Sequence, residues 1–266
     1  MMNRKELTRE KIIQALVNAF RPIDYAHAFY EGGAAAFNRV DEWSDIDLYL
    51  VVDDDKVDEA FAAFETTLKS LSAMKQKYEI PQSPFPGVYQ AFYKLEDTNE
   101  YLPIDLAVLK LSSPDKFLEP EIHGEVVFYF NKLDKVRCSP LDKNALTKRV
   151  LERLERLKAR FAMFNNFVQK EINRKNYLEA LDLYHHLTLA TLVEALRMKH
   201  NPVHYDFKMR YVHYELPQDV VQRLENLYFV NNKGDLQKKY REAIEWFHKL
   251  VSTIDEENVE RLIRLA

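Results

Sequence analysis

Apolar residues recur with two different periods along the chain, and the change of period divides the sequence. Over the first 138 residues, short apolar runs predict strands and two amphipathic stretches predict helices. The strands are expected over 25–30, 46–52, 88–95, 101–111 and 126–131, and the helices over 5–20 and 57–71. From Leu141 onward, apolar residues return every three or four positions, and this spacing predicts helices without strands.

The second region has the pattern of a helical bundle. Apolar stripes predict one long helix from Val150 to Ile172 and a second from Leu178 to Leu196, and further helical stripes follow as far as Val251. Pro217 is well placed for the first turn of the next helix. We therefore expect an α+β fold with two domains. Residues 1–138 form the strand-containing domain, residues 139–266 form an all-α domain, and the boundary lies near Cys138-Ser139-Pro140.

Composition narrows the class of protein. The 266 residues include 38 basic and 42 acidic side chains, so the net charge of −4 gives no global field that favours nucleic acid. The single cysteine, Cys138, excludes an intramolecular disulfide and fits a reducing compartment. No signal-peptide pattern and no membrane-spanning apolar run is visible, so we expect a cytoplasmic protein with no membrane partner.

An acidic pair opens the predicted strand over 46–52. Asp45 and Asp47 are separated by one residue, so their side chains share a face of the strand with Cα atoms roughly 6.5–7 Å apart. Two adjacent carboxylates repel each other, and a bound Mg²⁺ relieves that repulsion because this ion prefers oxygen ligands. The alternative is that both residues are solvated and cap a turn.

A glycine pair precedes the acidic pair by about a dozen residues. Gly32-Gly33 followed by Ala34 and two more alanines predicts a strand, a tight turn and the start of a helix. The start of a helix offers backbone N–H groups to a phosphate. A phosphate cradle close to a carboxylate pair suits a nucleotide bound with a metal ion.

These two motifs carry a resemblance to a known family. Gly32-Gly33-Ala34 and Trp43-Ser44-Asp45-Ile46-Asp47-Leu48 resemble the signature of the DNA polymerase β-like nucleotidyltransferase superfamily, most of all its minimal and antibiotic-modifying members that act on aminoglycosides and lincosamides. The resemblance implies a mixed β-sheet core flanked by helices, with a helical second domain. It also implies a glycine turn and a serine that hold the triphosphate, two aspartates that bind Mg²⁺, and a third acidic residue on a later strand.

The chain matches this pattern in part. Gly32 and Gly33 match the turn and Asp45 and Asp47 match the metal ligands, whereas Ala34 stands where the family has serine. The lost hydroxyl removes one hydrogen bond to phosphate, worth about 1–3 kcal/mol. Phe37 replaces a small residue often found there. We count Ala34 and Ser44 with Gly32 and Gly33 as nucleotide-binding positions.

Asp105 is the one acidic residue within a predicted apolar strand, the strand over 101–111. A carboxylate in such a strand is costly unless it is paired or binds a metal. A salt bridge to a lysine or arginine is one interpretation. The resemblance supports the other, in which Asp105 is the third carboxylate of the site, either as a metal ligand or as the general base for the attacking hydroxyl.

Basic and aromatic residues alternate in one stretch of the helical region, Arg197–Tyr214. Lys208 and Arg210 are candidates to contact the triphosphate or the acceptor, because such cations stabilise transferring phosphoryl groups. The alternative is an ordinary loop with surface charges.

The sequence therefore predicts a metal-dependent nucleotidyltransferase. Asp45, Asp47 and Asp105 are the expected catalytic and metal-binding residues, two Mg²⁺ ions are the expected cofactors, and a nucleoside triphosphate is the co-substrate. The expected acceptor is the hydroxyl of a small molecule, and pyrophosphate is released. Two alternatives stay open: a catalytically weakened nucleotide-binding regulator, suggested by Ala34 and Phe37, and an antitoxin-like transferase that modifies a protein or tRNA. The acidic charge balance argues against tRNA.

Overall fold

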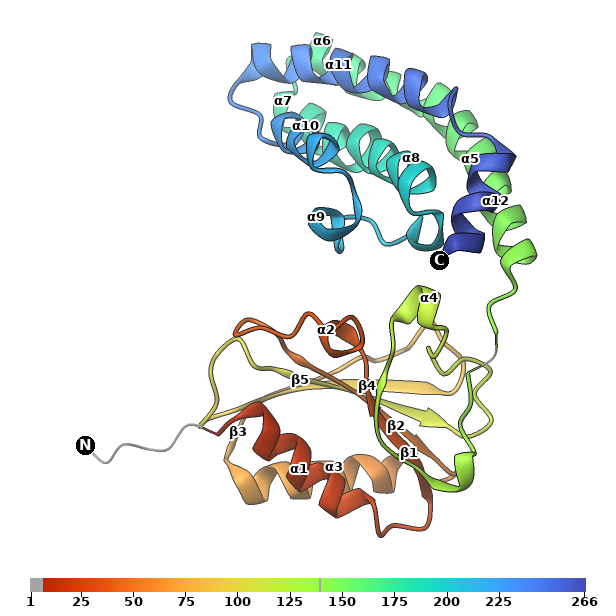
Figure 1. Cartoon of the computed structure of the whole chain (residues 1–266). Helices are drawn as coiled ribbons and strands as arrows, with labels where there is room; N and C mark the ends of the chain where they lie inside the picture. Colours follow the sequence, from red (N-terminus) through yellow and green to blue (C-terminus); the bar gives the residue numbers. More distant parts are fainter. Residues whose placement is uncertain (1–6, 139) are drawn as a thin grey trace. The chain divides into compact units, whose positions relative to one another are not determined.

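A computed structural model of the chain describes residues 7–138 and 140–266 (Figure 1). Its internal contacts divide it into two units, Met1–Pro140 and Leu141–Ala266. Some predictions fall outside the described residues. They are residues 1–6 of the predicted first domain, which include the start of the helix expected over 5–20, and Ser139 at the predicted boundary.

The first unit contains a mixed six-stranded sheet, which confirms the expected α+β class. The strand order is β3-β4-β5-β2-β1-β6. The central pair β2 and β5 is parallel, and the other neighbouring strands are antiparallel. The strands are β1 (Ala26–Glu31), β2 (Ile46–Val52), β3 (Met74–Glu79), β4 (Val88–Leu95), β5 (Ile104–Lys110) and β6 (Val127–Asn131).

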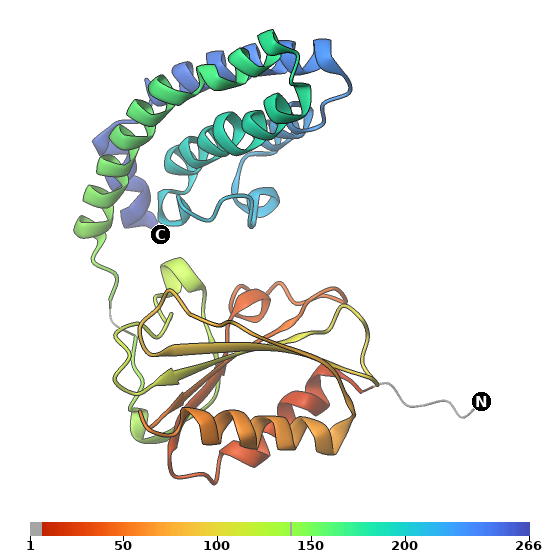
Figure 2. The same cartoon turned by 180° about the vertical axis from the view of Figure 1, so that it is seen from behind.

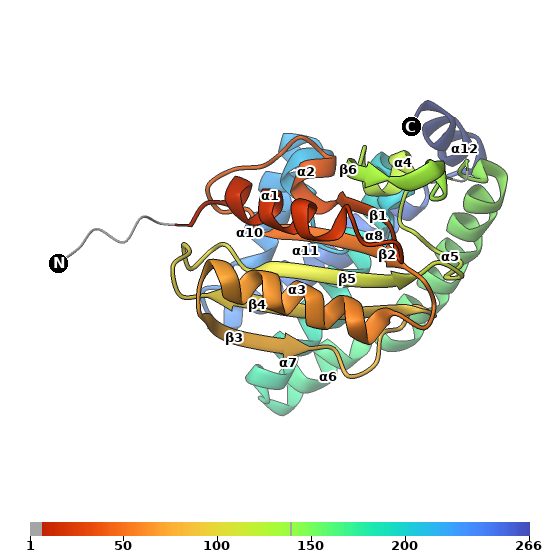
Figure 3. The ribbon, with the colours of Figure 1, turned by 90° about the horizontal axis from the view of Figure 1, so that it is seen from below.

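Two helices cover one face of the sheet and leave the other face to shorter elements. The helices α1 (Arg9–Phe20) and α3 (Val57–Leu71) lie side by side on the same face (Figures 1 and 3). Alternate residues of β2, including Ile46 and Leu48, are buried in the core beneath them. The short helices α2 (Gly33–Ala36) and α4 (Pro120–His123) lie on the opposite face. A 3₁₀ turn, Lys132–Asp134, follows β6.

The sequence did not predict β3, and it predicted β5 too long. β3 is an edge strand whose six residues are exposed except for the half-buried Met74, so it carries no apolar alternation. The strand expected over 101–111 forms only over Ile104–Lys110, although it pairs antiparallel with β4 as the expected hairpin requires.

The second unit is helical over its described residues, as expected (Figure 2). It contains α5 (Lys143–Phe164), α6 (Asn166–Arg174), α7 (Tyr177–Leu183), a π-helical turn (Tyr184–Leu189), α8 (Ala190–His200), a 3₁₀ turn (Pro202–His204), α9 (Val212–Glu215), α10 (Gln218–Tyr228), α11 (Lys233–Val251) and α12 (Glu256–Leu265).

Two of the predicted helices are interrupted. The helix expected over 150–172 breaks at Asn165, whose buried side chain accepts a hydrogen bond from Thr188 at 2.7 Å and donates one to Tyr240 at 3.2 Å. The helix expected over 178–196 contains the π-helical turn Tyr184–Leu189. Neither break follows from local apolar spacing.

No helix within the described residues combines the length and the apolar character that a membrane span requires.

Candidate nucleotide and metal site

The acidic residues meet at one end of two neighbouring parallel strands. Asp47 on β2 lies directly opposite Asp105 on β5 in the register of the sheet. Asp45 comes just before β2, two residues from Asp47, and therefore shares its face. This face is opposite the one that buries Ile46 and Leu48. Strand register thus gathers the three predicted carboxylates.

Asp105 lies in the most perturbed environment of the three. Burial raises the pKa of Asp105 to about 7, and the neighbouring Asp47 and Asp45 carboxylates add to the increase. Gln90 on β4 acts in the opposite direction, because its Nε2 donates to both carboxylate oxygens of Asp105 at 2.8 Å. Asp105 has no salt bridge with a lysine or arginine in the described part of the chain, so the simplest alternative interpretation of this residue is wrong.

The glycine turn is built around Asp47. The N–H of Gly32 donates to the backbone oxygen of Asp47 at 3.0 Å. Gly33 has φ of +53°, and a Cβ atom there would lie 1.6 Å from Asp47 Oδ2. At Gly32 a Cβ atom would lie 2.8 Å from Cε2 of Tyr49. The turn therefore requires glycine at 33, both for its left-handed backbone and for the close approach of the carboxylate.

The helix that starts in this turn is short. α2 is a single turn that ends at Ala36, with Phe37 as its C-cap, so its dipole is small. Ala34 lies within this turn, and the backbone N–H of Arg39 donates to its oxygen at 2.8 Å. The Arg39 guanidinium lies 5.0 Å from the centre of the Phe37 ring. Arg39 is therefore a cation held beside the glycine turn, which motif spacing did not single out.

Ser44 and Trp43 are fixed by a local turn before β2. The Ser44 hydroxyl donates to Asp41 Oδ1 at 2.7 Å, and the backbone N–H of Trp43 donates to the same oxygen at 3.0 Å. The Trp43 ring is 60% exposed and meets the edge of Tyr101 with a centroid separation of 4.9 Å. Tyr101 precedes β5 as Trp43 precedes β2, so two exposed aromatic rings lie at the acidic end of the sheet.

An ion pair between Arg9 and Glu31 lies next to the acidic residues. The sequence analysis did not predict it. Arg9 on α1 donates to the carboxylate of Glu31 and to the backbone oxygen of Asp45. The Tyr129 hydroxyl donates to the other oxygen of Glu31. Burial lowers the pKa of Arg9, while Tyr129, Asp47 and Asp45 raise it, which shows how near the guanidinium lies to the acidic pair. The only local sign of this ion pair in the sequence is Glu31, which directly precedes the glycine pair.

The donor chemistry of the site suits a hard divalent cation, but the side chains do not form a ready coordination group. Burial is the main cause of the raised pKa of Asp105, and the Asp47 and Asp45 carboxylates add to it. Carboxylate oxygens are the ligands that Mg²⁺ prefers. Among the residues that the structure describes, no three His, Cys, Asp or Glu side chains are arranged to hold a metal ion. Gln90 donates to both oxygens of Asp105, which orients the carboxylate and leaves lone pairs on each oxygen for a metal ion.

The predicted cations Lys208 and Arg210 belong to the helical unit. Arg197, which is fully buried, donates to the backbone oxygens of both residues and to the carboxylate of Glu215. The side chains of Lys208 and Arg210 are exposed, and the Arg210 guanidinium lies 4.9 Å from the centre of the Tyr211 ring. The stretch is therefore an ordered loop around a buried arginine.

Comparisons with known proteins show distant structural similarity to solved structures. No protein-family model and no curated protein matches it by sequence. It is similar to the structure of an aminoglycoside 6-adenyltransferase from Bacillus subtilis, with 12% identity and a TM-score of 0.36 over 97% of this chain and 92% of the other. It is also similar to the spectinomycin adenyltransferase AAD(9) from Enterococcus faecialis with ATP and spectinomycin, with 12% identity and a TM-score of 0.33 over 97% of this chain and all of the other (100%).

The resemblance is to antibiotic nucleotidyltransferases.

Proposed function

We propose that the chain transfers a nucleoside monophosphate from a nucleoside triphosphate to an acceptor hydroxyl and releases pyrophosphate. One observation carries the proposal: strand register sets Asp47 opposite Asp105, and Gly33 packs directly on the carboxylate of Asp47. The glycine turn and the Asp47 and Asp105 carboxylates are therefore parts of one local structure.

Asp45, Asp47 and Asp105 are the residues that would hold Mg²⁺. When bound, the ion would neutralise the carboxylates and the triphosphate together and polarise the α-phosphate. In this proposal the backbone N–H groups of the glycine turn and the Arg39 guanidinium contact the triphosphate. The exposed rings of Trp43 and Tyr101 offer a stacking surface for a nucleobase.

Asp105 has a second possible role. Its pKa of about 7 is matched to accept a proton near neutral pH. In that role its carboxylate takes the proton of the acceptor hydroxyl, the resulting oxygen attacks the α-phosphorus, and the bond to pyrophosphate breaks. Positioning and charge neutralisation supply most of the rate enhancement in such transfers.

The direct test is pyrophosphate release from α-labelled triphosphates with Mg²⁺ over a panel of hydroxyl-bearing acceptors. The panel includes an aminoglycoside and spectinomycin, the compounds named for the two similar structures. We expect label transfer to one acceptor class, at least about 10³-fold slower in Asp47→Asn, because this variant removes a charge at the reacting phosphate. Asp58→Asn, an exposed change on α3, is the control. Equal rates in Asp47→Asn and the unmodified chain would end the proposal.

One observation favours a second function, that of a nucleotide-binding regulator. Gln90 holds both oxygens of Asp105, and Ala34 lacks the hydroxyl of the family's serine. Titration calorimetry separates the two functions. A regulator binds a nucleoside triphosphate with micromolar or tighter affinity while the full acceptor panel yields no pyrophosphate, and Gln90→Ala does not start turnover.

A further inference from the structure

Four neighbouring strands place the parts of the candidate site in one order across the sheet. The glycine turn follows β1, Asp47 lies on β2, Asp105 lies on β5, and Gln90 lies on β4. Neighbouring strands are about 4.8 Å apart, so each part is one strand spacing from the next. Asp47 is directly opposite Asp105, and Gln90 is hydrogen-bonded to Asp105, so the three side chains share one face. The site is therefore a row that runs from the glycine turn to β4.

The direction of this row decides from which side an acceptor approaches. In phosphoryl transfer the attacking and leaving oxygens lie roughly in line, on opposite sides of the phosphorus. In the proposed reaction the triphosphate is held at the glycine turn, so pyrophosphate leaves on the β1 side. The acceptor hydroxyl then approaches from the opposite side, where Gln90 is the next polar side chain after Asp105.

Gln90 uses only half of its amide group within the fold. Its Nε2 donates to both carboxylate oxygens of Asp105 at 2.8 Å. A carboxylate only accepts hydrogen bonds, so the amide nitrogen and not the oxygen faces Asp105. The amide oxygen Oε1 receives no hydrogen bond from any residue that the structure describes, and it is not enclosed. Because both amide atoms are bonded to one carbon, a free acceptor atom lies close to Asp105.

An aromatic ring continues the same face of the sheet. Phe92 lies directly opposite Asp105 in the register of β4 and β5, so the two side chains point to the same side. The Phe92 ring is half-buried, and among the described residues it belongs to neither of the apolar clusters that pack on the sheet. Phe92 therefore offers an apolar surface beside Asp105 and Gln90.

We propose that Gln90 determines which acceptors are used. Its amide nitrogen holds the Asp105 carboxylate, and its amide oxygen accepts a hydrogen bond from a donor on the carbon next to the reacting hydroxyl. Phe92 packs against the apolar side of the same acceptor. The preferred acceptors are hydroxyl compounds with a neighbouring hydrogen-bond donor, of which 1,2-diols are the simplest. This role of Gln90 depends on the proposed transfer reaction.

The test compares two probes that differ in one hydrogen-bond donor. The diol trans-cyclohexane-1,2-diol has a donor next to the reacting hydroxyl, and its monomethyl ether lacks that donor. With the full chain, α-labelled ATP and Mg²⁺, we expect kcat/KM for label transfer to be at least about tenfold higher for the diol, mainly through KM. A ratio of about two, which the two equivalent hydroxyls of the diol give without any contact, would overturn the proposal.

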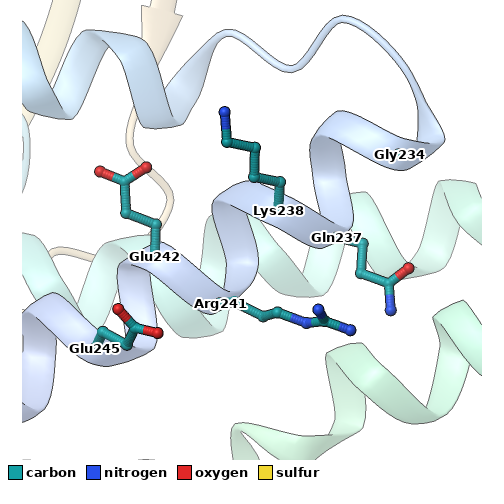
Figure 4. A pocket seen from close by; sticks show the side chains of 6 residues that line it. All are labelled: Gly234, Gln237, Lys238, Arg241, Glu242 and Glu245. Atoms are coloured by element: carbon teal, nitrogen blue, oxygen red, sulfur yellow. The ribbon is translucent and has the colours of Figure 1, made fainter.

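Three variants assign the discrimination to a residue. In Gln90→Met, kcat should fall for both probes because Asp105 is no longer held, and the kcat/KM ratio should fall to about two because the acceptor contact is lost. Phe92→Leu should raise KM for both probes and leave their ratio unchanged. The matched control is Gln237→Met, at a half-buried glutamine on α11, where residues of that helix alone line a shallow depression (Figure 4). An equal loss of discrimination in Gln237→Met would contradict the assignment.

The same assay separates this proposal from the transfer reaction itself. If no acceptor is labelled, or if Asp47→Asn transfers label as fast as the unmodified chain, both proposals are wrong. If Asp47→Asn loses transfer while Gln90→Met keeps the ratio of the unmodified chain, only the role of Gln90 is wrong. If only a larger acceptor of the panel is labelled, that compound and its O-methylated form replace the two probes.

A measurement without turnover guards against a variant that fails to fold. In the unmodified chain labelled with ¹⁵N-glutamine, with Mg²⁺ and a non-hydrolysable ATP analogue, the diol should shift one side-chain amide signal at least about twice as far as the ether does, because a hydrogen bond to Oε1 polarises the amide. Gln90→Asn, which keeps an amide, should move that signal and so assign it. Equal shifts with the two probes would overturn the proposal.

Discussion

Each unit holds a buried arginine that fixes the backbone beside its charged residues, and the two arginines differ in their surroundings. Arg197 is fully buried and donates hydrogen bonds to Glu215 and to two backbone oxygens, so its role is structural. Arg9 is nearly buried, with a side chain 14% exposed, and it lies close enough to Asp47 and Asp45 for their charges to raise its pKa. In the helical unit, the arginine that positions the loop is separate from the charges that face solvent. In the sheet unit, the same arginine holds the backbone and contributes to the field of the site.

The largest effect is expected from removing the arginine of the helical unit. Arg197→Met leaves the buried carboxylate of Glu215 with His204, at 2.9 Å, as its remaining partner, and it also removes the donors to two backbone oxygens. We expect the free energy of unfolding to fall by about 3–5 kcal/mol. Denaturant unfolding measures this loss. Arg210→Met, which removes an exposed cation from the same loop, should change stability by less than about 0.5 kcal/mol. Similar losses in the two variants would contradict the structural role of Arg197.

Removing the arginine of the sheet unit should affect both stability and activity. Arg9→Met leaves the carboxylate of Glu31 with the Tyr129 hydroxyl alone, so we expect a loss of about 2–4 kcal/mol. Because Arg9 also holds the backbone of Asp45, label transfer should fall at a temperature where the variant remains folded. Lys11→Met, an exposed change on the same helix, is the control. An unchanged rate of label transfer in the folded Arg9→Met variant would show that Arg9 does not contribute to the activity of the site.

A smaller and pH-dependent effect is expected at Asp105. Its pKa in the folded chain is about 7, above the ordinary value of 3.8, so the folded state holds a proton that the unfolded state has already lost. The resulting stabilisation is complete below about pH 4 and is lost as the pH rises through 7. The Asp105→Asn variant cannot ionise at this position. We therefore expect the Tm of the variant to rise relative to the Tm of the unmodified chain as the pH increases from 5 to 8. The gain should reach roughly 2–3 kcal/mol in stability, because a pKa raised from 3.8 to about 7 is worth about 1.4 kcal/mol for each pH unit between 5 and 7.

Thermal unfolding at pH 5, 6, 7 and 8 tests this prediction, with Asp58→Asn as the exposed control. A Tm difference that does not change with pH would show that Asp105 ionises normally. If Asp105 binds Mg²⁺ as proposed, the ion competes with the proton for this carboxylate, and the affinity of the unmodified chain for Mg²⁺ should increase over the same pH range.

The smallest stability effect is expected at the exposed aromatic pair. Trp43→Ala removes a ring that is 60% exposed, so the free energy of unfolding should change by less than about 0.5 kcal/mol. If the ring stacks on the nucleobase, the KM for the triphosphate should rise about fivefold or more while kcat changes little. Tyr78→Ala, which removes an exposed ring from the edge strand β3, is the control. An unchanged KM would exclude a stacking role.

Most of the fold was predictable because its buried elements carry their period in the sequence. β2 alternates the buried Ile46 and Leu48 with the half-buried Asp47 and Tyr49. α3 shows Val57, Phe64 and Leu68 at helical spacing. β3 shows no period of apolar residues, because it lies at the edge of the sheet and is mostly exposed. The break at Asn165 depends on Tyr240, 75 residues later in the sequence, so no window of local sequence contains its cause.

The candidate site was predictable where motif spacing fixes it and not where distant residues complete it. The glycine pair and the Asp45–Asp47 pair are short-range patterns. Arg9 reaches Glu31 across 22 residues, and Gln90 reaches Asp105 across 15, and neither pair has a local signature. These contacts follow from strand order and helix packing, which the apolar pattern alone does not specify.

The π-helical turn has a consequence for insertions and deletions in this helix. A residue advances an α-helix by about 100°, so one residue more or fewer between Tyr177 and Leu189 would rotate every later side chain of α8 by that angle. Glu194, which makes a two-point ion pair with Arg153 on α5 at 2.5 and 2.8 Å, would then turn away from its partner. Single-residue deletions here should therefore be far more disruptive than substitutions, because they change the phase of the whole helix and not the chemistry of one position.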